Sequence, residues 1–326
     1  MGVAGQRMTI EDHLESERNG EARGELLSGL RASPKYIPCV FLYDEQGSEL
    51  FEQITRLEEY YPPRVEIPLL GNMARAMGEG WKGVDVVELG SGDCSKISVI
   101  LNAMAPEHRR TVRYVPLDVS RAAIEKSAAA LTEAFEHLRI HAMVADFRTQ
   151  MHLIPSQRPR VFCFLGSTIG NFSRAQAETF LQKLSNTMQD NDALLLGLDM
   201  VKDPDVLERA YNDQKGVTAR FNKNVLNVVN RHLKTSFEPD DFEHVAFYNE
   251  DRCRIEMHLK ARKDLSAESP FLNEPIRLQE GETIHTENSH KFTDKRLRRL
   301  AEKADLELAH KVTDDRQWFS VARLVK

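Results

Sequence analysis

The sequence lacks long apolar runs. Nowhere in its 326 residues is there a stretch near the roughly eighteen apolar residues of a membrane-spanning helix, and the N-terminal stretch has no apolar core of an export signal. We therefore expect no membrane partner and a cytoplasmic location. CxxC pairs are also missing. The four cysteines are far apart, which favours reduced thiols over a disulfide framework or a zinc knuckle.

Clusters of basic residues are equally scarce. The formal net charge is −6, from 44 Lys and Arg against 50 Asp and Glu. Charges of both signs are mixed along the chain, so no basic stripe is available to bind a phosphate backbone. We expect a monomeric protein that binds small molecules and has no nucleic-acid partner.

A repeating pattern begins near residue 84, where short β-branched apolar runs start to alternate with amphipathic stretches. The runs are VDVVEL at 84, VRYVPLD at 112, IHAMVADF at 140, RVFCFLG at 160 and ALLLGLDMV at 193. Two of the amphipathic stretches open with Ser120 and Ser173, which are good helix N-caps. The pattern predicts an α/β fold with a doubly wound parallel sheet covered on both faces.

The rest of the chain differs from this repeat. We expect a partly ordered lead-in at 1–35, a helical segment at 36–80, the βα core at 81–201, an insertion at 202–290, and a helix with a closing strand at 291–326. Apolar residues at helical spacing in the second part are interrupted by Pro62 and Pro63. The insertion begins with a long helical stretch at a point where a plain Rossmann sheet would return to its last strands.

Two glycines follow the first strand of the repeat. In VDVVELGSGDCSK, Gly90 and Gly92 lie where glycines let the backbone approach a nucleotide-like ligand. The third glycine of the dinucleotide fingerprint is replaced by Ser95, which disfavours a dehydrogenase. Glu88, just before the glycines, would repel a pyrophosphate but suits a positively charged cofactor. The turn therefore favours a sulfonium nucleoside.

Acidic residues end the next two strands. Asp118 closes YVPLD and can accept hydrogen bonds from both ribose hydroxyls. Asp146 closes MVADF and can accept from an adenine amine, with the ring of Phe147 beside it. A lone GxG is common, and an aspartate at a strand end is often only a helix N-cap. Because these features fall at successive strand ends on one edge of the sheet, together they predict an S-adenosylmethionine site.

Several longer stretches are more specific than the glycine turn. They are YDEQGSELFEQITRLEEYYPPRVE, ELGSGDCSK, FLGSTIGNF, AYNDQKGVTARFNKNVL, RIEMHL and TENSHKF. From about residue 40 onward, the chain resembles the histidine Nα-methyltransferases of ergothioneine biosynthesis. The resemblance implies a Rossmann-like methyltransferase domain with a second α+β domain, built from the N-terminal helices and the late insertion, that binds the amino acid. It also implies three methyl transfers from S-adenosylmethionine to the α-amine of L-histidine, giving hercynine.

The resemblance further implies the residues of both ligand sites. Those around the cofactor are Gly90, Lys96, Asp118, Asp146 and Phe147, in addition to Glu88 and Gly92 of the glycine turn. Those around histidine are Tyr60, Asn171, Tyr211, Glu287 and Ser289, with Met257 shaping the pocket. The choice of Tyr60 over Tyr61 rests on the spacing from Tyr43. An exposed lysine on the first helical turn is the alternative for Lys96. No metal is expected.

Methyl transfer from a sulfonium needs little acid–base chemistry. A neutral amine must lie about 3 Å from the methyl group, in line with the departing sulfur. The amide of Asn171 can accept from the amine and donate to the α-carboxylate. Three transfers produce a quaternary ammonium, which an aromatic face such as that of Tyr60 tolerates. We therefore assign Asn171 and Tyr60 to the catalytic step, although a Gly-Asn turn is the alternative for Asn171.

The stretch TIHTENSHKF, residues 283–292, admits two interpretations. His285 and Glu287 have the spacing of a His-x-carboxylate pair, which with a third histidine would make a non-haem iron triad. As a regular strand, however, it carries His285, Glu287 and Ser289 on one face, where Glu287 and Ser289 can bind both nitrogens of an imidazole. We favour the imidazole site because the pattern indicates βα repeats rather than a barrel. His285 has no role in it.

Substrates other than histidine remain an alternative within the same enzyme class. Fungal relatives of the family methylate a prenylated tryptophan, whose indole cannot use two polar partners as an imidazole can. Glu287 and Met257 both match the histidine-type pocket. The sequence therefore favours L-histidine over a tryptophan-like amino acid.

Overall fold

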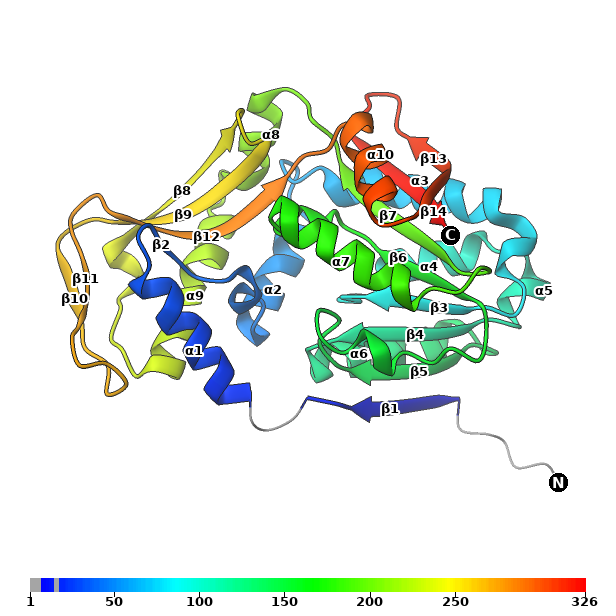
Figure 1. Cartoon of the computed structure of the whole chain (residues 1–326), viewed down its shortest axis with the longest axis horizontal. Coiled ribbons are helices and arrows are strands. Elements are labelled where there is room, and N and C mark those ends of the chain that lie inside the picture. The colour runs from blue at the N-terminus through cyan, green and yellow to red at the C-terminus, as the bar shows by residue number, and fades with distance from the viewer. Residues whose placement is uncertain (1–6, 15–17) are drawn as a thin grey trace. The chain divides into compact units, whose positions relative to one another are not determined.

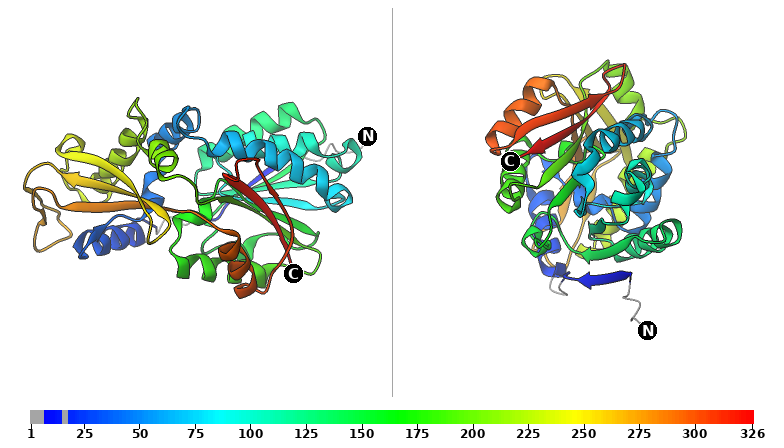
Figure 2. Two further views of the ribbon diagram at one scale, coloured as in Figure 1. Left: turned by 90° about the horizontal axis from the view of Figure 1, so that it is seen from above. Right: turned by 90° about the vertical axis from the view of Figure 1, so that its right-hand side faces the viewer.

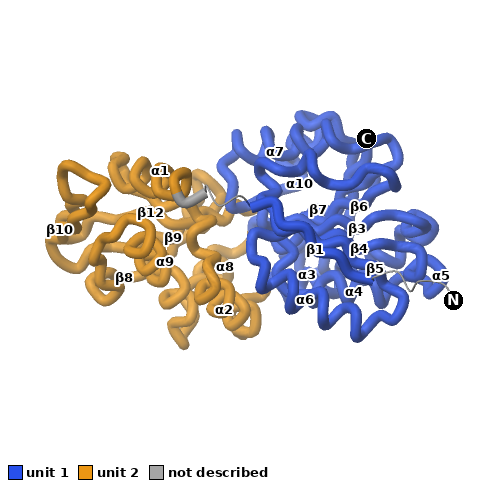
Figure 3. The backbone as a smooth tube through the Cα atoms, turned by 90° about the horizontal axis from the view of Figure 1, so that it is seen from below, with its two compact units in different colours: residues 1–14, 62–201, 292–326 blue, residues 15–61, 202–291 orange. Residues whose placement is uncertain are grey.

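The computed structural model describes residues 7–14 and 18–326, which form two compact units (Figure 3). Unit 1 consists of Met1–Leu14, Pro62–Val201 and Phe292–Lys326, and unit 2 of Glu15–Tyr61 and Lys202–Lys291, as far as these residues are described. None of the helices in the described ranges is long and apolar enough to cross a membrane. The expected end of the core at residue 201 coincides with a boundary between the units.

Unit 1 is built on an eight-stranded sheet of order β1-β5-β4-β3-β6-β7-β14-β13. The strands are β1 Met8–Asp12, β3 Asp85–Leu89, β4 Arg113–Asp118, β5 Arg139–Val144, β6 Arg160–Phe164, β7 Ala193–Asp199, β13 Glu307–Thr313 and β14 Phe319–Val325. The strands β1, β3, β4, β5, β6 and β7 run parallel, whereas β14 is antiparallel to β7 and β13 is antiparallel to β14 at one edge. The five apolar runs are thus confirmed as strands of a Rossmann-like α/β sheet.

Helices cover both faces of this sheet (Figure 2). They are α3 Pro62–Met77, α4 Ser95–Ala103, α5 Pro106–Arg109, α6 Arg121–Ala134, α7 Arg174–Thr187 and α10 Asp294–Lys303, with the 3-10 turns η2 Gly78–Trp81, η3 Met151–Leu153 and η4 Thr168–Asn171. Ser120 and Ser173 cap α6 and α7 with their side chains, as expected. Because both faces are covered, β3, β6 and β7 are buried along their whole length, and their sequences are continuous apolar runs.

The N-terminal part of the chain differs from the expectation. Residues 1–6 and 15–17 of the expected lead-in lie outside the described residues, but Met8–Asp12 pairs in parallel with β5 and residues 18–31 form a helix. The segment expected at 36–80 is divided between the units, because α3 packs in unit 1 against α4 and β14. As expected, the helical pattern of this segment breaks at Pro62 and Pro63: α2 ends at Ile54, and the prolines begin α3, where a proline in the first turn forfeits no internal hydrogen bond.

Unit 2 contains a four-stranded sheet of order β2-β12-β9-β8 (Figure 1). Its strands are β2 Lys35–Tyr36, β8 Phe242–Asn249, β9 Arg254–Ala261 and β12 Thr283–His290, beside the pair β10 Leu265–Ala267 and β11 Ile276–Leu278. Its helices are α1 Arg18–Arg31, η1 Cys39–Leu42, α2 Glu45–Ile54, α8 Pro204–Tyr211, α9 Val217–Leu233 and η5 Pro239–Asp241. Helix α9 packs on β8 and β9. We call the face with Met257, towards α9, the inner face, and the opposite face, with His258, the outer face.

Candidate functional site

A sharp turn follows β3 in unit 1. Gly90 and Gly92 adopt φ values of 72° and 51°, in the left-handed region that favours glycine. The Gly90 N–H donates to Leu117 O of the neighbouring strand at 2.8 Å. A Cβ atom at Gly90 would lie 3.5 Å from the Phe147 ring, which is an ordinary contact, so the backbone conformation rather than the space requires glycine here. The turn therefore brings Gly90 and Phe147 together.

Asp118 ties this turn to β4. Its Oδ2 accepts from Gly92 N at 3.1 Å and its Oδ1 from Ser120 N at 2.9 Å. Burial raises the pKa of Asp118, although the hydrogen bonds from the backbone act in the opposite direction. Each carboxylate oxygen keeps a second lone pair, which suits two hydroxyls of a ribose.

Asp146, the expected adenine acceptor, is engaged by its own neighbour. It is buried, and its carboxylate accepts from the backbone N (2.8 Å), Nε (3.1 Å) and Nη2 (2.8 Å) of Arg148. Phe147 packs edge-on against Phe164 and Phe180, with centroid distances of 5.5 and 5.9 Å. An adenine amine at Asp146 would share the carboxylate with Arg148, a residue that the sequence reasoning missed.

Glu88 carries less charge than the sequence argument assumed. The residue is only 2% exposed, and its carboxyl accepts from Tyr114 Oη at 2.5 Å. Burial raises the pKa of Glu88 to about 8, although the hydrogen bond from Tyr114 and the charge of Lys96 both lower it. Burial therefore favours the protonated form of Glu88 near neutral pH, which weakens the negative charge inferred beside the glycines.

Lys96 pairs with a buried carboxylate that the sequence reasoning missed. Its Nζ lies 3.1 Å from Glu66 Oε2, and Glu66 Oε1 accepts from Gly166 N at 2.7 Å. Gly166 has a φ of 71°, and a Cβ atom there would lie 2.7 Å from Lys96 Nζ. Glu66 and Lys96 thus hold the loop that follows β6. A glutamate on the buried face of α3 was the available signal for Glu66.

Asn171 lies in this same loop, at the end of η4. Ser167, with φ at 57°, begins the turn, and its Oγ accepts from Asp199 N at 3.0 Å. The Asn171 side chain is half-buried and makes no hydrogen bond with any residue that the structure describes. The loop is therefore fixed to β7, and the amide of Asn171 keeps its donors and acceptor for a ligand.

The inner face of unit 2 carries Met257, Glu287 and Ser289. Glu287 is directly opposite Met257 in the β9–β12 ladder, and Ser289 is opposite the buried Ile255, so these side chains share a face. The ladder has a β-bulge between His285 and Glu287, and His285 pairs instead with His258 of the outer face. The expectation that His285 shares a face with Glu287 is therefore wrong, because the extra residue breaks the alternation.

A buried lysine completes the polar group on this face. Tyr211 Oη donates to Ser289 Oγ at 2.8 Å. Lys291 Nζ donates to Ser289 Oγ at 2.8 Å and to Tyr211 Oη at 3.4 Å, and Lys291 is only 1% exposed. The sequence reasoning missed Lys291, although its place two residues after Ser289 is the signal for a shared face.

Aromatic rings lie beside Tyr211 of this polar group. Tyr60 lies 6.1 Å from the ring of Tyr211 and 6.2 Å from that of Phe51. Burial, followed by the charge of Glu287, raises the pKa of Tyr43 well above its usual value. Lys202 Nζ donates to the Tyr61 hydroxyl at 2.7 Å. These contacts favour Tyr60 over Tyr61 as the tyrosine of the substrate set.

The geometry opposes the iron triad with His285 and Glu287, since these residues lie on opposite faces of the sheet. The carboxylate near His285 is that of Glu256, and His258 Nε2 lies 3.3 Å from Glu256 Oε2. Burial lowers the pKa of His285 to about 4, and the charge of His258 acts in the same direction. His285 thus belongs to an outer-face cluster.

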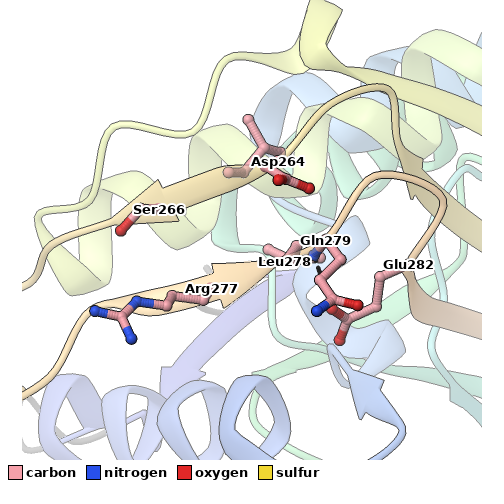
Figure 4. Close-up of a pocket in the computed structure, with 7 residues that line it drawn as sticks. Asp264, Ser266, Arg277, Leu278, Gln279 and Glu282 are labelled. Atoms are coloured by element: carbon pink, nitrogen blue, oxygen red, sulfur yellow. Dashed lines mark hydrogen bonds between the residues drawn. The ribbon is translucent and has the colours of Figure 1, made fainter.

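A hollow of about 480 Å³ lies elsewhere in unit 2, along β10 and β11 (Figure 4). It is lined by Asp264, Leu265, Ser266, Arg277, Leu278, Gln279 and Glu282. None of these seven residues was expected in either ligand site. The hollow therefore gives no independent support to the candidate site.

A Rossmann-like sheet whose glycine turn lacks the dinucleotide fingerprint is compatible with a methyltransferase that uses S-adenosylmethionine, and the match to a family model identifies this class. The chain belongs to the family described as "Histidine-specific methyltransferase, SAM-dependent", whose model matches residues 22–326.

The relatives agree with this family. The chain is 39% identical over 320 residues to the histidine N-alpha-methyltransferase of Mycolicibacterium smegmatis, covering 98% of this chain and 99% of the relative. It is 40% identical over 288 residues to the protein of that name from Mycobacterium tuberculosis, covering 88% and 89%. Ergothioneine biosynthesis protein 1 of Neurospora crassa is 29% identical over 310 residues, covering 93% of this chain and 34% of that protein.

Proposed function

We propose that this protein transfers methyl groups from S-adenosylmethionine to the α-amino group of L-histidine, three times in succession, and so makes hercynine in the first step of ergothioneine biosynthesis. The observation that carries the substrate assignment is the shared inner face of Glu287 and Ser289. In unit 1, the turn at Gly90, the carboxylate of Asp118 and the ring of Phe147 are proposed to bind the nucleoside of the cofactor.

The hydrogen bonds around Ser289 support recognition of a neutral imidazole. Ser289 Oγ accepts from both Tyr211 Oη and Lys291 Nζ, each at 2.8 Å. A lysine can only donate, and a hydroxyl that accepts twice keeps its own hydrogen to donate to a ligand. Ser289 is therefore a donor and the Glu287 carboxylate an acceptor. A neutral imidazole, which has one N–H and one bare nitrogen, satisfies both.

The same two side chains discriminate against an indole. An indole has an N–H but no ring acceptor, so it leaves the Ser289 hydroxyl unpaired. A buried donor without a partner costs about 1–3 kcal/mol. Sites built to form a hydrogen bond reject ligands that cannot form it more strongly than apolar pockets reject a change of size.

Asn171 is proposed to orient the reacting amine. Its amide oxygen accepts from the neutral amine, and its NH₂ group donates to the α-carboxylate. In each round the nitrogen lone pair forms a bond to the methyl carbon while the carbon–sulfur pair goes to sulfur, which leaves as neutral S-adenosylhomocysteine. The first two products each lose a proton before the next round, and the third keeps a permanent charge. The neighbouring rings of Tyr60, Phe51 and Tyr211 are suited to bind that quaternary ammonium.

The direct test is incubation of the purified protein with S-adenosylmethionine and an equimolar mixture of L-histidine and L-tryptophan, with the products identified by mass. We expect mono-, di- and trimethylated histidine to appear in succession, and tryptophan to stay unmodified. Methylation of tryptophan without methylation of histidine would contradict the substrate assignment.

Replacement of Glu287 by Ala tests the imidazole site itself. We expect Glu287→Ala to weaken histidine binding by about 1.5–3 kcal/mol, the worth of a hydrogen bond to a charged group. The affinity for S-adenosylmethionine should not change, because the proposed cofactor residues lie in unit 1. Titration calorimetry with each ligand measures both, and Glu243→Ala, at an exposed position of β8, is the matched control. An equal loss for both ligands counts against the assignment.

A further inference from the structure

We propose that the outer face of the unit 2 sheet carries a binding site for a divalent transition-metal ion of the zinc type, formed by Glu256, His258 and His285. One ligand atom from each of the three residues lies within 4.8 Å of the other two. None of the three belongs to the proposed histidine or cofactor sets. The site therefore adds to the proposed function and does not depend on it.

The sheet brings these residues together through β9 and β12. Glu256 and His258 are two residues apart on β9 and therefore point to the same side. His285 is the direct cross-strand partner of His258, and the two rings lie 5.1 Å apart. The bulge at Thr286 allows this, because it leaves His285 on the outer face while Glu287 stays on the inner face.

The separations suit a metal ion. Glu256 Oε2 and His258 Nε2 are 3.3 Å apart, which is about the distance between two atoms that bind one zinc tetrahedrally at roughly 2.0–2.1 Å. In the metal-free protein the His258 N–H donates to the carboxylate, and a metal ion would replace that proton. The ring of His258 is stacked on Phe247 at a centroid distance of 5.5 Å, which holds its plane.

Neighbouring groups orient the other two ligands. His285 Nε2 lies 3.0 Å from Asn288 Oδ1, and because an amide oxygen only accepts, Nε2 carries the hydrogen and the lone pair is on Nδ1. Metal-binding histidines commonly donate their second N–H to such an oxygen. Glu256 Oε1 accepts from Arg254 Nε at 2.9 Å, which leaves Oε2 for an ion. The charge of Arg254 lowers the affinity for a cation but fixes the carboxylate.

The donor set selects the kind of ion. Two imidazoles and one carboxylate favour Zn²⁺ and its neighbours among the transition metals over Mg²⁺ and Ca²⁺, which prefer oxygen ligands only. The site lies on the face opposite Glu287 and Ser289. An ion there would brace β12 beside its bulge and would not touch the bound amino acid.

The test is titration of the full-length protein with ZnCl₂. The protein carries no polyhistidine tag, is stripped with a chelator, and contains neither histidine nor S-adenosylmethionine. We expect one Zn²⁺ per chain, and a loss of affinity of at least about 100-fold in His285→Ala and His258→Ala, because a lost ligand costs more than the roughly 10–100-fold of a lost outer partner. His310→Ala, at an exposed histidine of β13 in unit 1, should bind as the wild type does.

A second variant, Asn288→Leu, serves if a histidine variant folds poorly. It removes only the hydrogen bond between His285 Nε2 and Asn288 Oδ1 and keeps all three metal ligands. We expect it to weaken Zn²⁺ binding by roughly 10–100-fold while the circular dichroism spectrum stays that of the wild type. Equal Zn²⁺ affinity in the wild type and in the His258→Ala/His285→Ala double variant would overturn the proposal, as would failure of the folded wild type to bind Zn²⁺. Either result leaves the methyl-transfer assay untouched.

Discussion

Lys291 is a basic residue in the interior of unit 2, where burial of a charge is unfavourable. A buried ammonium persists only when hydrogen bonds compensate its lost hydration, and here two hydroxyls accept from it. We expect Lys291→Met to raise the KM for histidine by roughly 10–100-fold, because the Ser289 hydroxyl loses a charged donor worth about 1.5–3 kcal/mol and is no longer restricted to donating. Steady-state kinetics with each substrate varied in turn measure this.

The control for this variant is Lys260→Met, at an exposed lysine of β9. Its KM for histidine should equal that of the wild type. If Lys291→Met raised the KM for S-adenosylmethionine and not that for histidine, Lys291 would not belong to the amino-acid site.

The raised pKa of Glu88 predicts that the free energy of unfolding depends on pH. Its pKa is about 8 in the folded protein against an ordinary value of 4.5, so between these pH values the folded state binds more protons at this group than the unfolded state does. The free energy of unfolding should therefore fall by on the order of 1 kcal/mol per pH unit across this window, and this contribution should be constant above pH 8. Glu88→Gln keeps an acceptor for Tyr114 but does not titrate.

Urea unfolding of the cofactor-free protein at pH 5, 7 and 9 checks this prediction. The stability of Glu88→Gln relative to the wild type should increase with pH. Glu133→Gln, at an exposed position of α6, should follow the wild type throughout. Parallel curves for the wild type and Glu88→Gln would mean that the Glu88 carboxyl is ionised in the folded state.

Single residues of the candidate site differ in how far the sequence could predict them. Gly90 and Asp118 stand at strand ends, so the strand pattern alone indicated where they meet. Glu66 and Lys291 are charged groups inside the fold, and their partners are distant in sequence: Glu66 bonds to Gly166, and Lys291 to Tyr211. Local pattern indicates which face each residue occupies, but only the folded chain brings it to its distant partner.

At the scale of elements, one asparagine joins α9 to the sheet of unit 2. Asn222 is fully buried, its Nδ2 donates to His258 O at 3.1 Å, and its Oδ1 accepts from Thr286 Oγ1 at 2.6 Å. We expect Thr286→Val to lower the free energy of unfolding by about 1–3 kcal/mol, because the Asn222 oxygen is left buried without its donor. Thr286→Ser keeps the hydroxyl and should lose much less. Chemical denaturation of both variants gives the comparison, and equal losses would assign the effect to packing.

The same element explains why the sequence predicted one face of β12 incorrectly. Strict alternation places His285 on the inner face and Thr286 on the outer face. Because of the extra residue at the bulge, His285 instead lies on the outer face, and both Thr286 and Glu287 lie on the inner face. A bulge has no signature in TIHTENSHKF, since every residue there is compatible with a regular strand. The strands β3, β6 and β7 were predictable because both of their faces are buried and a slip in register leaves them apolar.

At the scale of the molecule, the proposal assigns the nucleoside of the cofactor to unit 1 and the imidazole of the substrate to unit 2. Hydrogen exchange measured by mass spectrometry should therefore give separable footprints. S-adenosylmethionine should protect amides near residues 89–92, 118–120 and 146–148, and S-adenosylhomocysteine with histidine should add protection near 211 and 285–291. Protection of the second set by the cofactor alone would contradict this division.

The division of the chain into units was only partly predictable. The insertion after Val201 was predictable because a helical stretch stands where a Rossmann sheet would continue with strands. By contrast, α3 has the same amphipathic character as the helices of unit 2. Its assignment to unit 1 depends on contacts with α4 and with β14, which lies far along the sequence. Amphipathicity predicts that a helix packs through one face, but it does not predict which helix or sheet it packs against.

The chain passes from one unit to the other after Leu14, Tyr61, Val201 and Lys291, so that neither unit is one continuous segment. Unit 2, which we propose binds the amino acid, therefore cannot be exchanged as a single block of gene between relatives, in the way that a terminal domain can. Under the proposed site assignment, a change of substrate instead arises by substitution within the existing strands, at positions such as Met257, Glu287 and Ser289. Selection for a new substrate then acts on side chains and leaves the connectivity as it is.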